Sequence, residues 1–265
     1  MHVLTSRVAD LVIIVAVMLG VLSLAILPFL HPAYVALAQE RAEATAWTGF
    51  TDVDLRTVTD AILADLVVGQ PDFDVTLGGA PVLNERERAH MGDVRSVFIG
   101  FFALALVLVV AAMTIARRRR DEQATVRTWA AIRTGSLGLA VGLIVLGAVA
   151  LVAFDVLFEV FHQMLFPGGS YTFDPTTERL VQLFPFRFWQ ESAIAVGVVA
   201  VALGFALAFV ASRRQAAARA AVGETIEAAP AGVTAAAAPT TDHDRATDSR
   251  PATDNGRATV TPDAP

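Results

Sequence analysis

Residues 97–120, VFIGFFALALVLVVAAMTIARRRR, determine the fold class of this 265-residue chain. The first 20 residues of the stretch carry no charge, and the four arginines Arg117–Arg120 follow them directly. An α-helix needs about 20 apolar residues, at about 1.5 Å per residue, to cross roughly 30 Å of hydrocarbon. The stretch therefore predicts a membrane-spanning helix that ends in a cluster of positive charge.

Three further segments have the same length and apolar character, namely residues 8–30, 137–158 and 193–211. The chain is 55% hydrophobic with a mean hydropathy of +0.56, and its apolar residues are clumped into these long runs. The pattern predicts an all-α membrane protein in which residues 1–212 form a four-transmembrane-helix bundle.

The first span has one feature of a secretory signal peptide, because Ala36-Leu37-Ala38 fits a cleavage site. Cleavage there would leave three spans. However, the apolar run exceeds the roughly 7–15 residues typical of a signal-peptide core, and its basic region is only Arg7. A retained span is the favoured interpretation.

The arginines predict how the bundle is oriented. The 117–136 segment holds six of them and the residues just after the fourth span hold three more, whereas the 31–96 segment contains many aspartates. The positive-inside rule therefore places the 117–136 loop and both termini in the cytoplasm of a multi-pass cell-membrane protein. Residues 31–96 and 159–192 would then be extracytoplasmic.

Residues 213–265 are rich in Ala, Pro, Thr and Asp without apolar periodicity, and we expect them to form a disordered cytoplasmic tail.

The remaining composition excludes several classes of site. The chain has no cysteine, which excludes disulfides, thiolate metal ligands and a cysteine nucleophile. No basic patch is interleaved with aromatic residues, so nucleic acid is not an expected partner. All 20 basic residues are arginine, a bias typical of GC-rich actinobacterial genes.

The 31–96 segment is long enough for a small extracytoplasmic lid. Apolar residues at helical spacing predict a helix over 53–66, with Thr51 or Asp52 as its N-cap. Residues 73–77 alternate in polarity and predict a short strand. Residues 84–95 predict a helix that continues into the second span.

The 84–95 helix carries the first candidate functional residue, His90. By helical spacing Glu87 and His90 share one face, as do His90 and Asp93, so that Asp93 could accept a hydrogen bond from the imidazole. A solvated juxtamembrane helix with ordinary charge pairs would show the same pattern.

The 159–192 segment is dense in aromatic residues, Gly and Pro, which suits a membrane interface. Pro167 ends the helical run of the third span, and Gly168-Gly169 permits a sharp turn. His162 lies one helical turn past Phe158. Because His90 precedes the second span and His162 follows the third, a compact bundle would bring the two imidazoles together at one end.

The blocks 85–95 and 162–169, with Leu183-Phe184-Pro185 and Phe188-Trp189, resemble the integral membrane protein family of the bacterial lipoprotein intramolecular transacylase. The resemblance covers about residues 1–212. It implies an enzyme that moves an acyl chain from the sn-2 ester of a lipoprotein's diacylglyceryl group to the α-amino group of its N-terminal cysteine. It also implies that His90 and His162 are the catalytic pair, with a membrane lipid or diacylated lipoprotein as partner and no cofactor or metal.

Within this interpretation we assign His162 as the base that acts on the amine and His90 as the group that stabilises the oxyanion or protonates the leaving oxygen, and the reverse assignment fits the residues nearly as well. Asp93 would orient His90, and Arg95 would contact a headgroup or the oxyanion. The aromatic loop 166–189 would shape an acyl groove. The full supporting set is Glu87, Asp93, Arg95, Phe166, Gly168, Gly169, Tyr171 and Trp189.

Other classes fit the residues less well. The main alternative is a non-enzymatic membrane protein whose lid binds a lipid, a peptide or a partner subunit. A metal site built from His31, His90, His162 and a carboxylate lacks any closely spaced ligand motif. A serine hydrolase lacks a Gly-x-Ser-x-Gly elbow. A transporter is disfavoured because no span carries a charge near its middle.

Overall fold

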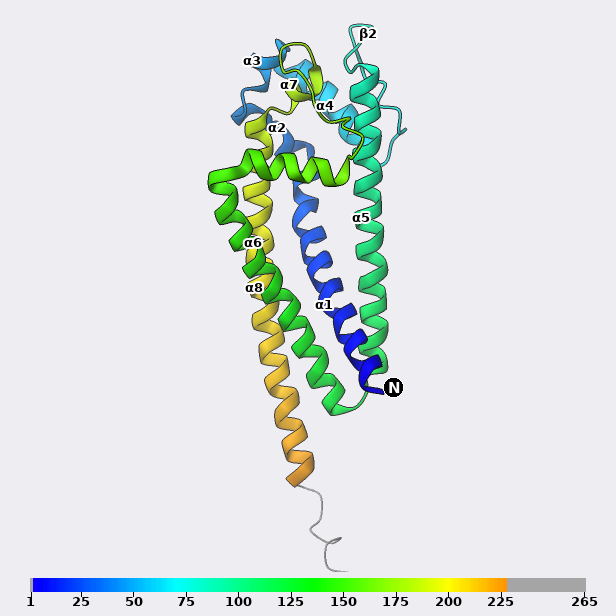
Figure 1. Ribbon diagram of the computed structural model, residues 1–265, viewed down its shortest axis with the longest axis vertical. Helices are drawn as coiled ribbons and strands as arrows, with labels where there is room; N and C mark the ends of the chain where they lie inside the picture. The colour runs from blue at the N-terminus through cyan, green and yellow to red at the C-terminus, as the bar shows by residue number, and fades with distance from the viewer. Residues whose placement is uncertain (1, 228–265) are drawn as a thin grey trace, which may run out of the picture. The chain divides into compact units, whose positions relative to one another are not determined.

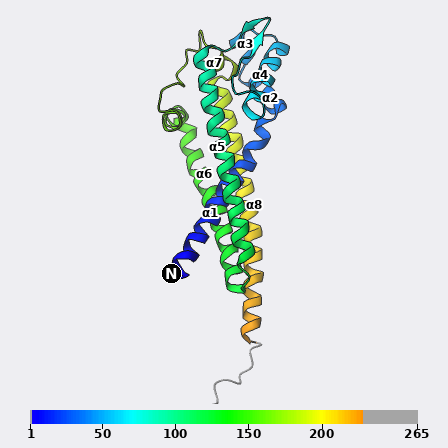
Figure 2. The same ribbon diagram turned by 90° about the vertical axis from the view of Figure 1, so that its right-hand side faces the viewer.

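The computed structural model describes residues 2–227 and contains four long apolar helices (Figure 1). They are α1 (His2–Ile26), α5 (Glu85–Arg118), α6 (Glu122–Leu165) and α8 (Phe186–Glu227). Each is long and apolar enough to cross a membrane, and the prediction of an all-α four-span protein is confirmed. Helix α1 is extended by the 3-10 turn η1 (Leu27–Leu30) and packs against both α5 and α6 (Figure 2).

Small residues allow the spans to approach closely. A Cβ atom added at Gly135 of α6 would lie 2.8 Å from the backbone oxygen of Ile14 in α1. A Cβ atom at Gly204 of α8 would lie 3.1 Å from the oxygen of Ser136 and 3.2 Å from Ala140 Cβ, both in α6. In a bilayer, where burial of apolar surface does not drive helix association, such close packing is a main source of attraction.

The lid comprises the chain between η1 and α5 together with α7, and all of it lies at one end of the bundle (Figure 1). Its elements are α2 (Pro32–Arg41), α3 (Ala44–Thr48), α4 (Asp52–Val67), the antiparallel strands β1 (Thr76–Leu77) and β2 (Ala80–Pro81), and α7 (Arg179–Leu183). It has an apolar core of its own, in which Val58, Phe73 and Leu183 are fully buried.

The lid helices begin largely as the sequence predicts. Thr51 caps α4, because its hydroxyl oxygen accepts a hydrogen bond from Asp54 N at 3.2 Å. Helix α5 begins after Asn84 and runs without interruption into the second span. The predicted 73–77 strand is wrong in its first half, because Phe73 adopts a left-handed conformation (φ +50°) that buries its ring, and only Thr76–Leu77 pair with β2.

The third long helix is longer than the 137–158 span that we expected, and it is bent. Helix α6 bends at Ala153 (φ −145°, ψ 40°), and residues 154–165 form an arm that runs across the bundle toward α5 in Figure 1 and is seen nearly end-on in Figure 2. Phe154 and Phe158 of the arm contact the Phe186 ring at 5.3 and 6.0 Å, and these contacts hold the arm in place.

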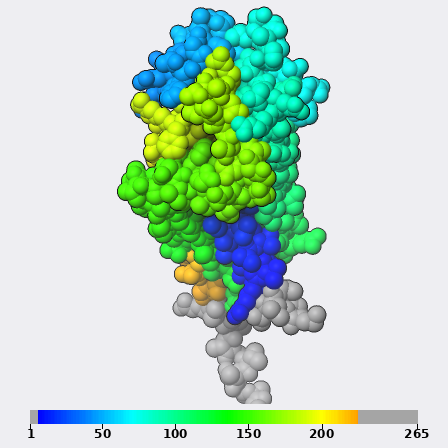
Figure 3. All heavy atoms as spheres, turned by 45° about the horizontal axis from the view of Figure 1, so that its top comes forward, coloured from blue at the N-terminus to red at the C-terminus, as the bar shows by residue number. Residues whose placement is uncertain are grey.

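The arm is amphipathic. Its residues at four-residue spacing divide into an inner row that ends in His162, a polar row with Glu159, and an exposed apolar row with Val160 and Met164. A helix with this pattern suits the boundary between headgroups and acyl chains. The arm and the loop after it form a continuous surface beside the lid (Figure 3).

The start of the predicted tail also differs. Helix α8 continues to Glu227, so residues 213–227 are helical, because their alanines and arginines are strong helix formers. Residues 228–265, where the rest of the expected disordered tail falls, lie outside the described residues.

Candidate active site

The bend in α6 brings the two predicted histidines together. His90 lies in the second turn of α5, and His162 lies in the last turn of the arm. Their ring centroids are 6.3 Å apart and the rings are nearly parallel, with an interplanar angle of 25°. Without the bend, the nine residues from Ala153 to His162 would carry the second imidazole about 13 Å further along the α6 axis. The expected convergence is confirmed.

His162 has a defined tautomer in this geometry. Its Nδ1 lies 2.7 Å from the carbonyl oxygen of Phe158. A carbonyl only accepts, so the hydrogen bond requires a proton on Nδ1, and in the neutral ring the lone pair is then on Nε2. The ring also contacts Tyr171 at 5.1 Å and Phe166 at 5.8 Å between centroids.

His90 is buried, with 6% of its surface exposed. Phe166 and Phe173 contact its ring edge to face, at 4.8 and 5.4 Å between centroids. Its Nδ1 is buried without a hydrogen-bond partner among the described residues. An unsatisfied buried polar atom is costly, and it is common where a ligand supplies the missing partner.

Tyr171 joins the predicted site through the arm. Its hydroxyl donates a hydrogen bond of 2.7 Å to Glu159, which also accepts from Gln163 at 2.8 Å. The hydrogen bond to Glu159 and partial burial together raise the pKa of the Tyr171 phenol above its ordinary value. The phenol therefore stays protonated at neutral pH and anchors the loop to the arm.

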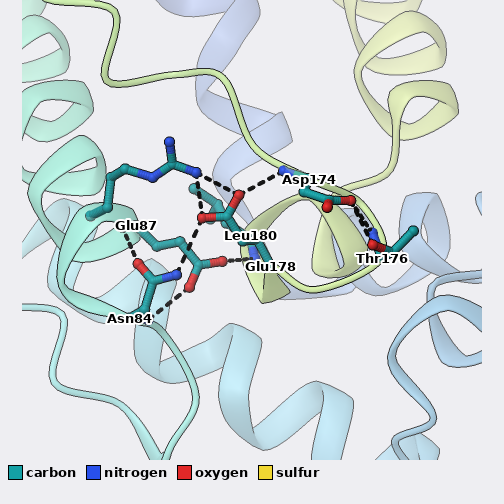
Figure 4. A network of polar contacts seen from close by, with 7 residues as sticks. Asn84, Glu87, Asp174, Thr176, Glu178 and Leu180 are labelled. Atoms are coloured by element: carbon teal, nitrogen blue, oxygen red, sulfur yellow. Dashed lines mark hydrogen bonds and ion pairs between the residues drawn. The ribbon is translucent and has the colours of Figure 1, made fainter.

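A polar network fixes the position of the loop beside His90 (Figure 4). Glu87 is 1% exposed, and its carboxylate accepts hydrogen bonds from Asn84 N at 2.7 Å and Leu180 N at 2.6 Å. Asn84 in turn accepts from Glu87 N, which completes a capping box at the start of α5. Glu87, predicted as a supporting residue, thus joins α5 to α7.

Sequence reasoning missed Glu178, the other acid of this network. Arg86 donates to both of its oxygens, and Asp174 N donates at 2.6 Å. Burial alone would raise the pKa of the Glu178 carboxyl, but the hydrogen bonds from Arg86, Asp174 N and Asn84 outweigh burial and lower it. The Arg86 guanidinium also lies 5.0 Å from the centroid of Phe173, the ring that packs on His90.

Two predicted supporting residues have contacts other than those expected. Asp93 projects toward the loop rather than under the imidazole, and it accepts a hydrogen bond from Ser170 at 3.3 Å instead of one from His90. Arg95 donates to the backbone oxygens of Asp65 and Gly69 at the end of α4, which leaves it a structural tie rather than an oxyanion contact.

Trp189 is predicted only as part of the loop that would shape an acyl groove, and within residues 2–227 we find no contact between its ring and either imidazole. Its ring lies 6.4 Å from Phe158, whose ring lies 4.1 Å from His162. It also packs against Phe184 and Phe188, within the aromatic cluster at the start of α8.

A cavity of about 330 Å³ lies near the imidazole pair, although neither His90 nor His162 is among its lining residues. Phe166, which contacts both imidazoles, also lines this cavity. The polar part of the lining comes from Asp93, Ser96 and Ser170, and the rest comes from Val97, Leu165, Phe166, Pro167 and Gly168. Gly169, with a φ of +72°, makes the turn of the loop beside the cavity, and its N–H donates to the Phe166 oxygen at 3.0 Å. The arrangement can hold a polar group and an apolar chain next to an acid–base pair.

The alternative metal site receives no support from the geometry. Within residues 2–227, no three His, Asp or Glu side chains gather closely enough to hold a metal ion. His31 has another role, because its Nδ1 accepts a hydrogen bond from Ala33 N at 3.2 Å and caps α2.

Four apolar spans with an imidazole pair beneath a lid define an integral membrane protein with a candidate acid–base site at one end of its bundle. The sequence model of the lipoprotein intramolecular transacylase family, Lit, matches residues 11–189. The chain belongs to this family. The resemblance found in the 85–95 and 162–169 blocks is thereby confirmed.

Solved structures agree in fold. The membrane-integral lipoprotein intramolecular transacylase Lit from Bacillus cereus is similar with a TM-score of 0.64 and 15% sequence identity, over 81% of this chain and 97% of that one. A structure of the same enzyme with one histidine substituted gives a TM-score of 0.58, over 81% and 95% of the two chains at 15% identity.

An uncharacterised protein of Aquifex aeolicus (strain VF5) is 27% identical over 131 residues, which are 49% of this chain. The chain spans just over half, 57%, of that relative's length.

Proposed function

We propose that this protein transfers an acyl chain within a diacylated lipoprotein, from the sn-2 ester of the diacylglyceryl group to the α-amine of the N-terminal cysteine. The observation that carries the proposal is the stacked pair of imidazoles, His90 and His162, beside a cavity in a chain of the Lit family. An imidazole has an unperturbed pKa of about 6.5, which suits acid–base work near neutral pH.

His162 is the base in this proposal. Its Nδ1–H is engaged by the Phe158 carbonyl, so that Nε2 is the nitrogen able to take a proton from the attacking amine. The same contact fixes the orientation of the ring. It also stabilises the imidazolium once formed, because Nδ1–H becomes a stronger donor when the ring is charged.

His90 stabilises the oxyanion. Its burial against Phe166 and Phe173 favours the neutral ring, which keeps one N–H donor and has no extra proton to release. A neutral N–H aimed at the developing alkoxide lowers the barrier by electrostatic stabilisation.

The transfer balances with these two groups. The amine nitrogen attacks the ester carbonyl carbon, and the C–N bond forms as the amine proton passes to His162. The tetrahedral intermediate then collapses, the bond from carbon to the glyceryl oxygen breaks, and the His162 imidazolium returns the proton to that oxygen. An N-acyl amine and a free glyceryl hydroxyl result. Because amine and ester belong to one molecule, holding them at near-attack distance supplies part of the rate, up to about 7–11 kcal/mol in favourable cases.

The orientation of the bundle is part of this proposal. The lid and the imidazole pair lie at the end opposite Arg117–Arg120, which the positive-inside rule assigns to the cytoplasm. The site would then lie at the outer leaflet, with the exposed apolar row of the arm among lipid chains. A lipoprotein ester would reach the cavity from the side.

The test is expression in a bacterial host that lacks lipoprotein N-acylation. The transfer is an isomerisation and leaves the intact mass unchanged, so tandem mass spectrometry must locate the acyl chain on nitrogen or on glyceryl oxygen. We expect N-acylated product with wild type and a loss of about 10²–10⁴-fold in His162→Ala. His31→Asn, which changes a histidine that only caps α2, is the matched control and should behave as wild type.

Equal N-acylation by His162→Ala and wild type would refute the assignment of His162 as the base. Absence of N-acylated product with a correctly inserted wild-type protein would favour the non-enzymatic alternative instead.

A further inference from the structure

A second cavity lies between α6 and α8 at the arginine-rich end, far along both helices from the imidazole pair. Its volume is about 380 Å³. The lining residues are Ala130, Arg133 and Thr134 of α6 with Ser212, Gln215, Ala216 and Arg219 of α8. The acyl transfer proposed above uses none of them.

The cavity has a structural origin. The two helices are in close contact where Gly204 meets Ser136 and Ala140. Beyond that contact they diverge toward the arginine-rich end (Figure 1), and the short side chains of Ala130 and Ala216 do not fill the space between them.

The polar groups of the lining are mostly donors. Arg133 and Arg219 bring two guanidinium groups, one from each helix, and no acidic residue lines the cavity. Arg133 Nε donates to Ser212 Oγ at 3.1 Å, which orients that guanidinium toward α8. A planar guanidinium presents several N–H donors that match the oxygens of a phosphate group.

Gln215 adds a further hydrogen-bonding side chain to the lining. The residue is 8% exposed as a whole, and its side-chain amide is not among the fully buried, unpaired polar groups of the described residues. A bound oxyanion would accept a hydrogen bond from its NH₂ group.

We infer that this cavity binds a phosphate group, carried by an anionic phospholipid of the leaflet at the arginine-rich end. Two guanidiniums, the Thr134 hydroxyl and the Gln215 amide would hold the headgroup phosphate. Phe209 and Phe205 of α8, which are exposed about one and two turns from Ser212 toward the bundle centre, would contact the acyl chains. Basic pockets between spans are suited to such headgroups.

The experiment is thermal unfolding and native mass spectrometry of the full chain in detergent, with three probes: phosphatidylglycerol, phosphatidylcholine and inorganic phosphate. We expect phosphatidylglycerol to raise the melting temperature more than phosphatidylcholine. Arg133→Gln and Arg219→Gln should each weaken the apparent affinity about fivefold. The matched control is Arg127→Gln, an exposed α6 arginine outside the lining, which should leave the affinity unchanged.

Gln215→Leu removes the amide while keeping size and net charge, so it tests the site even where an arginine variant is unstable. Stabilisation by inorganic phosphate with the same dependence on Arg133 and Arg219 would support the site with free phosphate as the occupant. Equal stabilisation by both lipids, or equal losses in Arg127→Gln and the two lining variants, would overturn the proposal.

Discussion

Replacing Glu87 with Gln should destabilise the lid end of the molecule more than any other single-atom change in the site. The Glu87 carboxylate uses one oxygen for Asn84 N and the other for Leu180 N, at 2.7 and 2.6 Å. A glutamine has only one acceptor oxygen, so one buried N–H would lose its partner and face an NH₂ group. Charge-assisted hydrogen bonds contribute about 1.5–3 kcal/mol and an unsatisfied buried donor costs about 1–3 kcal/mol, so we expect a loss of about 2–4 kcal/mol.

That loss corresponds to a fall in melting temperature of about 5–15 °C for a chain of this size, measurable by tryptophan fluorescence in detergent. Glu85→Gln, an exposed substitution in the same turn of α5, should cost no more than about 1 kcal/mol and serves as the control. Hydrogen exchange would localise the effect, because the Leu180 amide should exchange faster in Glu87→Gln. If the two variants melt together, the link between α5 and α7 does not stabilise the lid as we describe.

Two further predictions concern stability. The pKa of the Glu178 carboxyl is lowered in the folded protein. Its ion pair should therefore stabilise the lid fully above the ordinary glutamate pKa of about 4.3 and lose that contribution as the pH falls through the lower folded value. In Glu178→Gln the melting temperature should depend less on pH across that range, and an equally steep dependence in the variant would contradict the assignment. Gly135→Ala should lower the free energy of unfolding by about 1–3 kcal/mol, because its methyl group would meet Ile14 O at 2.8 Å. Gly138→Ala has open space around its added Cβ and should leave the melting temperature unchanged. Equal effects of the two substitutions would show that α1 shifts freely.

The spans were predictable because the bilayer imposes length and polarity directly on the sequence. The start of α5 was predictable as well, since Asn84 and Glu87 have the spacing of a capping box. The bend at Ala153 was not, because no proline or glycine marks it and ring contacts made with α8 hold it. Each imidazole lies near a helix end on the same side of the bundle, which made their approach predictable, but their stacking depends on this bend.

Glu178 could not be found from sequence, since its partner Arg86 belongs to a different segment and no local spacing links them. The misassigned Asp93 shows the converse limit. Helical spacing correctly placed it beside His90 along α5, but its hydrogen-bond partner is Ser170, contributed by the loop after α6. Spacing within one helix does not identify contacts made with another segment.

The divided composition of the lid has a consequence for biogenesis. Its core combines Val58 and Phe73, made before the second span, with Leu183, made after the third. In the orientation proposed above, the first part crosses the membrane before its covering residues have been synthesised. The apolar surface of the early half therefore stays uncovered until two more helices have been inserted. During this interval the nascent protein is most exposed to proteases and in need of chaperones.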